Sequence, residues 1–351
     1  MDHLDGTLET VDGKPVLRFE RLLAHPPGKV WTAITDPAEM AHWFPAAVEF
    51  PAGPGPGGTG GPGGTGGPER PGGTGGPGDS PRPGAPMRFS FTDDAIDLGG
   101  RYREGEVLEF DPPKVYAFRW FDSVLRFELV PDAAGCRLVF THALSGARTW
   151  GDHPSAVRNA VGWDACLDAL NARLAGREPA GAGERWFLQR AEAYADAFGL
   201  SEGTVHGQPD GGYLVRFERD LVQPADTVWR TLTGEADPAP GSPPPGRFTH
   251  RYTPAGPVTA VEPPRLLEYE WLEDGAPAGR VRIELRHQEP IGTRLVVTET
   301  IPPRLASTRA VALAAWQVHL ELLFAALHGD ERVLRSERTE ELVKRYTARL
   351  R

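Results

Sequence analysis

Several features that would assign a function quickly are scarce in this 351-residue sequence. It has two cysteines, Cys136 and Cys166, which form neither a CxxC motif nor a metal-binding spacing. None of the ten histidines falls in a His-x3–5-His pattern, and no GxSxG motif marks a nucleophile. We therefore predict no metal, no cofactor and no catalytic residue set, and we expect reduced thiols in a cytoplasmic protein.

Long apolar runs and positive charge are also scarce. No run approaches the roughly 20 apolar residues needed to span a bilayer. The first residues, MDHLDGTLETVDG, are acidic and polar, unlike a secretory signal. The net charge of −10 and the pI near 5.5 argue against a nucleic-acid binder, which needs a basic face. We expect no nucleic-acid partner and no membrane span.

What the sequence does contain is an internal repeat. Residues 17–35, LRFERLLAHPPGKVWTAIT, align without a gap with residues 215–233, VRFERDLVQPADTVWRTLT. Three more matches follow in the same order: 105–120 with 256–271, 135–142 with 292–299, and Trp163, Leu167, Leu170, Leu174 and Gly176 with Trp316, Leu320, Leu323, Leu327 and Gly329. The unit is far longer than a solenoid repeat. The sequence therefore predicts two copies of one domain, 1–200 and 201–351.

Residues 51–86 differ in composition from the rest of the chain. They are mostly Gly and Pro, with recurring PGGTGGP runs, and cannot offset their ordering entropy by burial. This pattern predicts a disordered insert in the first domain. A Gly-rich phosphate loop is disfavoured, because no Gly-Lys-Ser/Thr motif, preceding apolar strand or following helix accompanies it.

The order of expected elements is the same in both copies. Alternation predicts a strand at 16–24, and helical spacing predicts a short helix at 29–35. Asp36 and Pro37 are typical of a helix start, and this second helix would carry Met40, Trp43 and Phe44. In the second copy GEADPAPGSPPPG replaces DPAEMAHWFP, so we expect that helix to be lost there.

A meandering antiparallel sheet and two helices should complete the first copy. The strands are expected at 87–92, 101–110, 115–121, 123–130 and 136–143, with one apolar aromatic face and one solvated face. Residues 154–176 and 183–199 have helical periodicity, and Asp164 and Asp168 lie off the apolar stripe of the first helix. The second copy should have strands at 213–222 and from about 247 to 300, and helices at 225–233, 304–328 and 330–350.

A resemblance to a known superfamily rests on motifs spread along the chain: RFER, VW, DPAEMAHWF, EVLEFDPP, F-x-W, L-x2-TH and GW-x3-L-x2-L. The pattern resembles the SRPBCC or START-like superfamily, which includes the birch-pollen-allergen-like proteins. Within it, the chain is similar to bacterial proteins related to the C-terminal domain of the activator of the heat-shock chaperone ATPase. The resemblance covers nearly all of the chain except the insert and about the first dozen residues. It implies an α+β helix-grip fold, duplicated in tandem, in which a curved antiparallel sheet wraps around a long C-terminal helix.

The same resemblance implies an apolar cavity between the sheet and the long helix. The candidate ligand-binding residues are the inward aromatic side chains, one histidine and the long-helix stripe: Trp43, Phe44, Phe89, Phe91, Tyr116, Phe118, Trp120, Phe127, Phe140, His142, Trp163, Leu167 and Leu170. For each of them, filling of the core is the alternative.

Three polar residues have two interpretations each. His142 could act at a cavity mouth as a base or hydrogen-bonding group, or it could be a solvated residue at a strand end. Arg21 and Arg219 fall on the apolar faces of their strands. Each could bind an acidic ligand head group, although the pattern favours an ion pair with a carboxylate.

Three functions are compatible with these residues. The first is non-catalytic binding or carriage of a small apolar or amphipathic molecule, with the first copy as the working copy. The second is an enzyme of the polyketide cyclase or aromatase type, and the third is a co-chaperone-like module that docks a protein partner. The sequence favours the first, because it contains no recognisable acid–base pair.

Overall fold

The computed structural model describes residues 4–51, 81–91, 104–146, 151–250, 252–288, 292–333 and 335–351. Contacts divide the chain into two compact units. The N-terminal unit is Leu8–Ser145 with Asp164–Ala180, and the C-terminal unit is Met1–Thr7, Gly146–Trp163 and Gly181–Arg351. Most of the predicted insert, 52–80, and part of the strand predicted at 101–110 lie outside the described residues.

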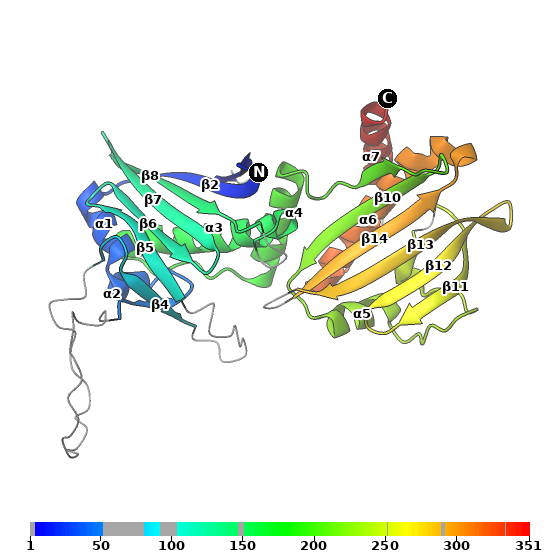
Figure 1. The fold of residues 1–351 in the computed structure, drawn as a ribbon, viewed down its shortest axis with the longest axis horizontal. Coiled ribbons are helices and arrows are strands. Elements are labelled where there is room, and N and C mark those ends of the chain that lie inside the picture. The colour runs from blue at the N-terminus through cyan, green and yellow to red at the C-terminus, as the bar shows by residue number, and fades with distance from the viewer. Residues whose placement is uncertain are drawn as a thin grey trace, which may run out of the picture. The chain divides into compact units, whose positions relative to one another are not determined.

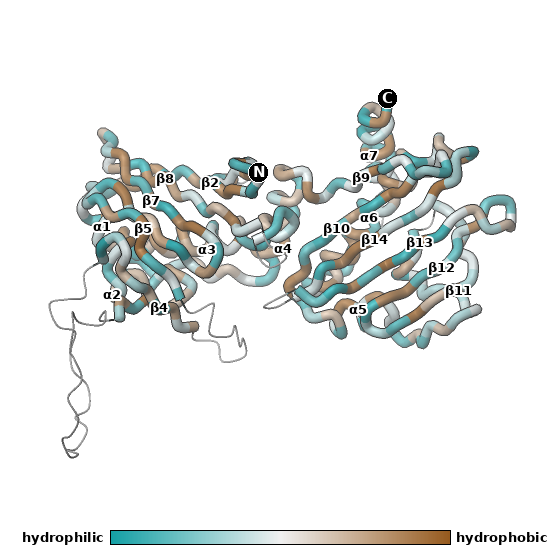
Figure 2. Tube along the Cα trace, viewed as in Figure 1, coloured by the Kyte–Doolittle hydropathy of each residue, from teal (hydrophilic) through white to brown (hydrophobic). Residues whose placement is uncertain are grey.

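The N-terminal unit is built on an antiparallel sheet with the strand order β1-β2-β8-β7-β6-β5-β4-β3 (Figure 1). Its strands are β1 (Gly6–Val11), β2 (Lys14–Leu23), β3 (Ala47–Glu49), β4 (Pro86–Ser90), β5 (Glu104–Asp111), β6 (Val115–Trp120), β7 (Ser123–Asp132) and β8 (Gly135–Ala143). Hydrophobic and hydrophilic residues alternate along the strands, visible as brown and teal in Figure 2. On β7 the buried side chains are Leu125, Phe127 and Leu129, which confirms the predicted apolar face.

Three helices accompany this sheet: α1 (Pro27–Thr35), α2 (Pro37–Met40) and α3 (Ala156–Leu174). The Asp36 side chain accepts a hydrogen bond from the Ala38 N–H at 2.9 Å, so it caps α2 as predicted. The helix ends at Met40, earlier than expected, and Trp43 and Phe44 follow in turns. Trp43 is nevertheless fixed, because its indole N–H donates to the Ala33 carbonyl at 2.9 Å.

The C-terminal unit holds the second sheet, with the order β11-β12-β13-β14-β10-β9 (Figure 1). Its strands are β9 (Thr204–Gly207), β10 (Tyr213–Leu221), β11 (Ala255–Glu262), β12 (Leu266–Glu273), β13 (Ala276–His287) and β14 (Thr293–Ile301). Its α-helices, besides the start of α3, are α4 (Glu184–Ala197), α5 (Ala225–Thr233), α6 (Arg309–Leu327) and α7 (Ser336–Arg349), and its 3-10 helices are η2 (His153–Ser155), η3 (Gly246–Phe248) and η4 (Pro303–Thr308). Leu313, Trp316 and Leu320 of α6 share one core with Phe217 and Val297 of the sheet.

The two sheets repeat one topology, as the sequence predicts. The order β2-β8-β7-β6-β5 in the first sheet corresponds to β10-β14-β13-β12-β11 in the second. A buried tyrosine hydroxyl also recurs: Tyr194 accepts from the Gly6 N–H at 3.2 Å, and Tyr346 accepts from the Gly203 N–H at 3.0 Å. The chain therefore contains the helix-grip fold in two tandem repeats.

Replacing Tyr346 by phenylalanine should lower the free energy of unfolding of the C-terminal unit by about 2 kcal/mol, because two buried hydrogen bonds are lost. Besides accepting from Gly203, its hydroxyl donates to Gln317 Oε1 at 2.6 Å. Urea denaturation measures the change. Tyr252→Phe, at a tyrosine that is 44% exposed, is the matched control and should change the value by less than about 0.5 kcal/mol. Equal losses in both variants would contradict this account.

Two parts of the fold depart from the predictions. The strand expected from about 247 begins at Ala255, and residues 246–248 form η3, because three consecutive prolines precede Gly246 and favour a helical start. The edge strands β1 and β9 were outside the predictions, because they are short, polar and mostly exposed. The loss of the second helix in this copy is confirmed, since 234–245 hold no helix.

The expectation about apolar runs needs correction. Among the described residues, one helical stretch, Pro303–Leu327, is long and apolar enough to cross a membrane by length and composition, with a mean hydropathy of 1.7. In the structure 61% of this window is buried. Its inner residues, including Ala314 and Trp316, are completely buried against the sheet, which is the environment of a core helix.

Candidate functional site

Aromatic side chains gather on the apolar face of the N-terminal sheet. Phe127 and Phe140 stack with a centroid distance of 4.7 Å, and Phe118 lies 6.2 Å from Phe127. Phe44, from the turn after α2, lies 6.0 Å from Phe118. We call the contiguous set the aromatic cluster; it comprises Phe19, Trp31, Trp43, Phe44, Phe89, Phe91, Phe110, Tyr116, Phe118, Trp120, Phe127 and Phe140.

Strand register explains why these rings meet. Directly opposite residues on neighbouring strands share a face of the sheet. One such row of the N-terminal sheet consists of Phe19, Phe140, Phe127, Tyr116 and Phe110. The corresponding row of the C-terminal sheet consists of Phe217, Val297, Ile283, Leu267 and Val261. Apart from Phe217, aliphatic side chains fill this layer in the C-terminal copy, whereas the N-terminal copy uses aromatic rings.

The structure places most of the predicted ligand-binding residues in the interior. Those that are at most 6% exposed are Trp43, Phe44, Phe89, Tyr116, Phe118, Phe127, Phe140, His142, Trp163, Leu167 and Leu170. The other two, Phe91 and Trp120, are only partly buried and lie 6.0 Å apart at the edge of the aromatic cluster. Phe89 stacks on Trp120 at 5.3 Å, so the buried rings continue directly into the partly exposed ones.

His142 lies inside the apolar layer of β8. In the register it stands between Leu125 and Leu17, on the same face as Phe140. Burial lowers the pKa of His142 to about 3, so the imidazole is neutral near pH 7. The interpretation as a solvated strand-end residue is therefore wrong, because β8 continues to Ala143 and His142 has the parity of the core. Glu299 occupies the corresponding position of β14.

The two arginines on apolar faces have different partners. Arg21 pairs with Asp164 at 3.1 Å and also with Asp168, both on α3, so the predicted ion pair is confirmed. Arg219 instead donates to the backbone carbonyl oxygens of Leu200, Glu218 and Ser201. The ion-pair prediction for Arg219 is wrong, because the loop before β9 provides carbonyl groups where a carboxylate was expected. Burial lowers the pKa of Arg219 to about 10.

A family comparison matches the region that contains the aromatic cluster. Residues 16–175 match the family described as "Polyketide cyclase / dehydrase and lipid transport". The N-terminal copy thus matches a family of the SRPBCC superfamily. The match spans somewhat less than half of the chain and ends at the last turn of α3. A search of curated proteins finds no match.

Solved structures similar to this chain include three bacterial proteins. CalU16 from Micromonospora echinospora is 18% identical, with 55% of this chain and 96% of that chain covered and a TM-score of 0.35. The BPP1335 product from Bordetella parapertussis is 24% identical, with coverages of 54% and 89% and a TM-score of 0.34. EF2215 from Enterococcus faecalis, a conserved protein of unknown function, is 18% identical, with coverages of 48% and 97% and a TM-score of 0.34.

Outside the SRPBCC match, the C-terminal unit contains a cavity of about 360 Å³ beside α6. We call it the α6 cavity; it is lined by Gly246, Arg247, Thr249, His250, Tyr252, Ala315, His319, Leu322, Leu323, Ala326, Glu331, Arg332 and Val333. His250 Nε2 lies 3.4 Å from Glu299 Oε2, and the Trp316 indole N–H donates to the same oxygen at 2.6 Å. Glu299 and Trp316 are completely or almost completely buried.

A second histidine on this cavity is held by the backbone. His319 Nε2 lies 2.7 Å from the Arg247 carbonyl oxygen, so this nitrogen carries the proton and donates. Burial lowers the pKa of His319 to about 4, and the ring is neutral near pH 7. Sequence reasoning missed His250 and His319, because no fixed spacing relates them. The one available signal for this site was that the second copy has Glu299 at the position where the first copy has His142.

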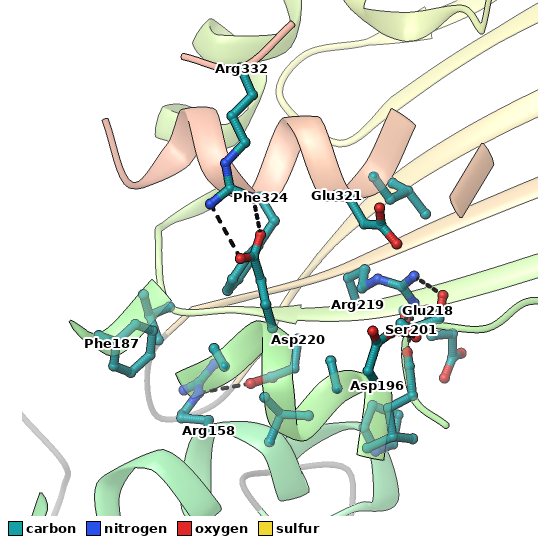
Figure 3. Close-up of a pocket in the computed structure, with 18 of the residues that line it drawn as sticks. Arg158, Phe187, Asp196, Ser201, Glu218, Arg219, Asp220, Glu321, Phe324 and Arg332 are labelled. Atoms are coloured by element: carbon teal, nitrogen blue, oxygen red, sulfur yellow. Dashed lines mark hydrogen bonds and ion pairs between the residues drawn. The ribbon is translucent and has the colours of Figure 1, made fainter. Parts of the chain in front are cut away.

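Another cavity of the C-terminal unit, about 250 Å³, is lined by a mixture of charged and apolar side chains (Figure 3). Arg158 pairs with Asp220 at 2.8 Å, and Arg338 pairs with Glu321 at 2.9 Å. Arg332 pairs with Glu192 at 2.5 Å. Because these charges already satisfy one another, the arrangement is typical of an ion-pair network that holds helices to the sheet. Among the described residues, no group of three or more His, Cys, Asp or Glu is arranged to hold a metal ion.

Proposed function

We propose that the N-terminal SRPBCC domain binds and carries a small apolar or amphipathic molecule against the aromatic cluster. The observation that carries this proposal is the difference between the two copies. Four positions in one cross-strand row are aromatic in the N-terminal sheet and aliphatic in the C-terminal sheet. Filling a core does not require this substitution, whereas contact with a flat apolar ligand would benefit from it.

The partly exposed edge of the cluster supports the same proposal. Trp120 is partly exposed, whereas Trp271 at the equivalent position is 1% exposed and its indole N–H donates to the Thr300 carbonyl. Trp120 lies 5.4 Å from Phe44 and 5.3 Å from Phe89. A ligand that stacked on Trp120 would therefore continue a series of rings that extends into the core.

The titratable groups in and beside the aromatic cluster, Tyr116 and His142, favour binding over catalysis. Burial keeps His142 neutral and raises the pKa of Tyr116 far above its usual range. A group that transfers protons near neutral pH needs a pKa close to that pH. Neither side chain meets this requirement, so we infer carriage without chemical change of the ligand.

Replacing Trp120 by alanine should weaken binding of the amphipathic probe anilinonaphthalene sulfonate by about tenfold, because the exposed stacking surface is lost. Fluorescence titration measures the affinity, and native mass spectrometry shows whether a copurifying compound is lost as well. Trp186→Ala is the matched control, since Trp186 is a partly exposed tryptophan on α4, outside the cluster. Equal affinity in wild type and Trp120→Ala would reject the site.

A further inference from the structure

His250 presents an unsatisfied buried nitrogen. Its side chain is 3% exposed, and Nδ1 has no hydrogen-bond partner among the described residues. The ring packs edge-on against Trp316 at 4.8 Å, which fixes its orientation. A buried polar atom without a partner costs free energy, so native structures rarely leave one unexplained. His250 lines the α6 cavity, where a bound molecule could supply the missing partner.

Glu299 determines the kind of partner that Nδ1 requires. Glu299 Oε2 accepts the Trp316 N–H and lies close to Nε2 of His250, so Nε2 is the nitrogen that carries hydrogen. In the neutral imidazole, Nδ1 is then a hydrogen-bond acceptor. The missing partner is therefore a donor, such as a hydroxyl or N–H group.

The walls of the α6 cavity determine the rest of the ligand. Ala315, Leu322, Leu323 and Ala326 line it from α6 with apolar groups. The cavity lining also includes Tyr252, which is 44% exposed, and Val333, which is 85% exposed. The charged rim residues already have partners: Arg247 pairs with Glu331 at 3.2 Å, and Arg332 with Asp330 at 2.7 Å. Because these charges are neutralised in pairs, the rim of the cavity has little electrostatic attraction for a charged ligand.

We propose that the α6 cavity binds a small, neutral, mainly apolar molecule that donates one hydrogen bond to His250 Nδ1. The cavity volume of about 360 Å³ suits a ligand of roughly two fused rings. This site is separate from the aromatic cluster and lies outside the family match, so it goes beyond the function proposed for the N-terminal domain. It gives the second copy a binding role of its own.

Two probes that differ in one hydrogen-bond donor test the proposal without any mutation. Calorimetric titration of the full chain at pH 8, where an imidazole is ordinarily neutral, compares α-naphthol with α-methoxynaphthalene. We expect α-naphthol to bind at least about tenfold more tightly, because only its hydroxyl can satisfy Nδ1. Equal affinities, or no binding of either probe, would overturn the proposal.

Two variants locate the preference at His250. His250→Phe keeps the shape of the ring and should make the two probes bind equally. In Glu299→Gln, the amide oxygen can take the place of Oε2 and accept from both the Trp316 N–H and His250 Nε2, so the preference for α-naphthol should be retained. His206→Phe, at an exposed histidine of β9, should leave the preference unchanged. A preference for α-naphthol that survives His250→Phe would also overturn the proposal.

The test distinguishes this site from the aromatic cluster. Trp120→Ala should leave the donor preference unchanged even where it weakens binding of anilinonaphthalene sulfonate. His250→Phe should abolish the donor preference and leave the binding of anilinonaphthalene sulfonate unchanged. If Trp120→Ala removed the donor preference, the hydroxyl would be recognised in the N-terminal domain, and the α6 cavity would not be the site.

Discussion

Replacing Arg21 by leucine should lower the free energy of unfolding of the N-terminal unit by about 3–5 kcal/mol. The Arg21 side chain is 10% exposed and pairs with Asp164, which is completely buried, at 3.1 Å. Without the guanidinium, the buried Asp164 carboxylate would lose its ion pair with Arg21, and breaking a buried ion pair is far more costly than losing a surface contact. Urea denaturation followed by hydrogen exchange of peptides from β2, β7 and β8 measures the change.

A second substitution separates charge burial from packing in this prediction. In the double variant Arg21→Leu with Asp164→Leu, neither member of the pair remains without the other, so most of the lost stability should return. Arg173→Leu is the control, because Arg173 and Glu39 form a bidentate pair on the surface of the same unit, with side chains 41% and 33% exposed. It should cost less than about 1 kcal/mol. A double variant as unstable as Arg21→Leu would contradict the explanation.

Local sequence signals were sufficient to predict the elements and their order. Asp36 followed by Pro37 predicts a helix start, and the structure has that cap. Alternation of Leu125, Phe127 and Leu129 predicts one buried face of a strand, and β7 has it. Each signal involves residues only a few positions apart, so no knowledge of distant contacts was needed. Because the motifs recur in the same order, each element predicted in the first copy could also be predicted in the second.

Contacts between distant segments explain what the sequence could not predict. Asp164 lies off the apolar stripe of α3 and would be expected in solvent, yet Arg21 from β2 makes its burial tolerable. His142 was placed at a strand end, although the register sets it between Leu125 and Leu17. In both cases the environment is set by residues more than 100 positions away or by strand pairing.

The candidate site in the second copy was even less accessible to sequence reasoning. Its polar groups come from three separate places: His250 follows η3, Glu299 lies on β14 and Trp316 lies on α6. Only Glu299 and Trp316 belong to the matched segments of the repeat. His250 lies just after the Pro- and Gly-rich segment 234–246 that replaces the lost helix, and this segment gives no pattern from which the histidine could be recognised.

The two copies accommodate a polar residue at the same buried position in different ways. In the second copy, Glu299 accepts a hydrogen bond from Trp316 and lies beside His250. In the first copy, His142 is accommodated by staying neutral, as the downward shift of its pKa indicates. A residue that is buried only in its neutral form makes the stability of the surrounding unit sensitive to acid.

The N-terminal unit should therefore lose stability as the pH falls below about 6.5, the ordinary pKa of histidine. In the folded chain the pKa of His142 is lowered to about 3, so between these values the unfolded chain binds a proton that the folded chain does not. Each pH unit in this window removes about 1.4 kcal/mol, and the contribution at pH 4 amounts to about 3 kcal/mol. Above pH 7 the contribution of His142 to the pH dependence should vanish.

Other groups also titrate in this window, so the prediction concerns the difference between variants. His142→Gln keeps a polar side chain but cannot take up the proton, so its free energy of unfolding should fall less steeply with acid than that of the wild type. Urea denaturation at pH 7, 6, 5 and 4, followed by hydrogen exchange of N-terminal peptides, gives both slopes. His42→Gln, at an exposed histidine of the same unit, should retain the wild-type slope. Parallel slopes for wild type and His142→Gln would mean that the folded protein admits the proton, and that His142 has access to water or to an acidic partner.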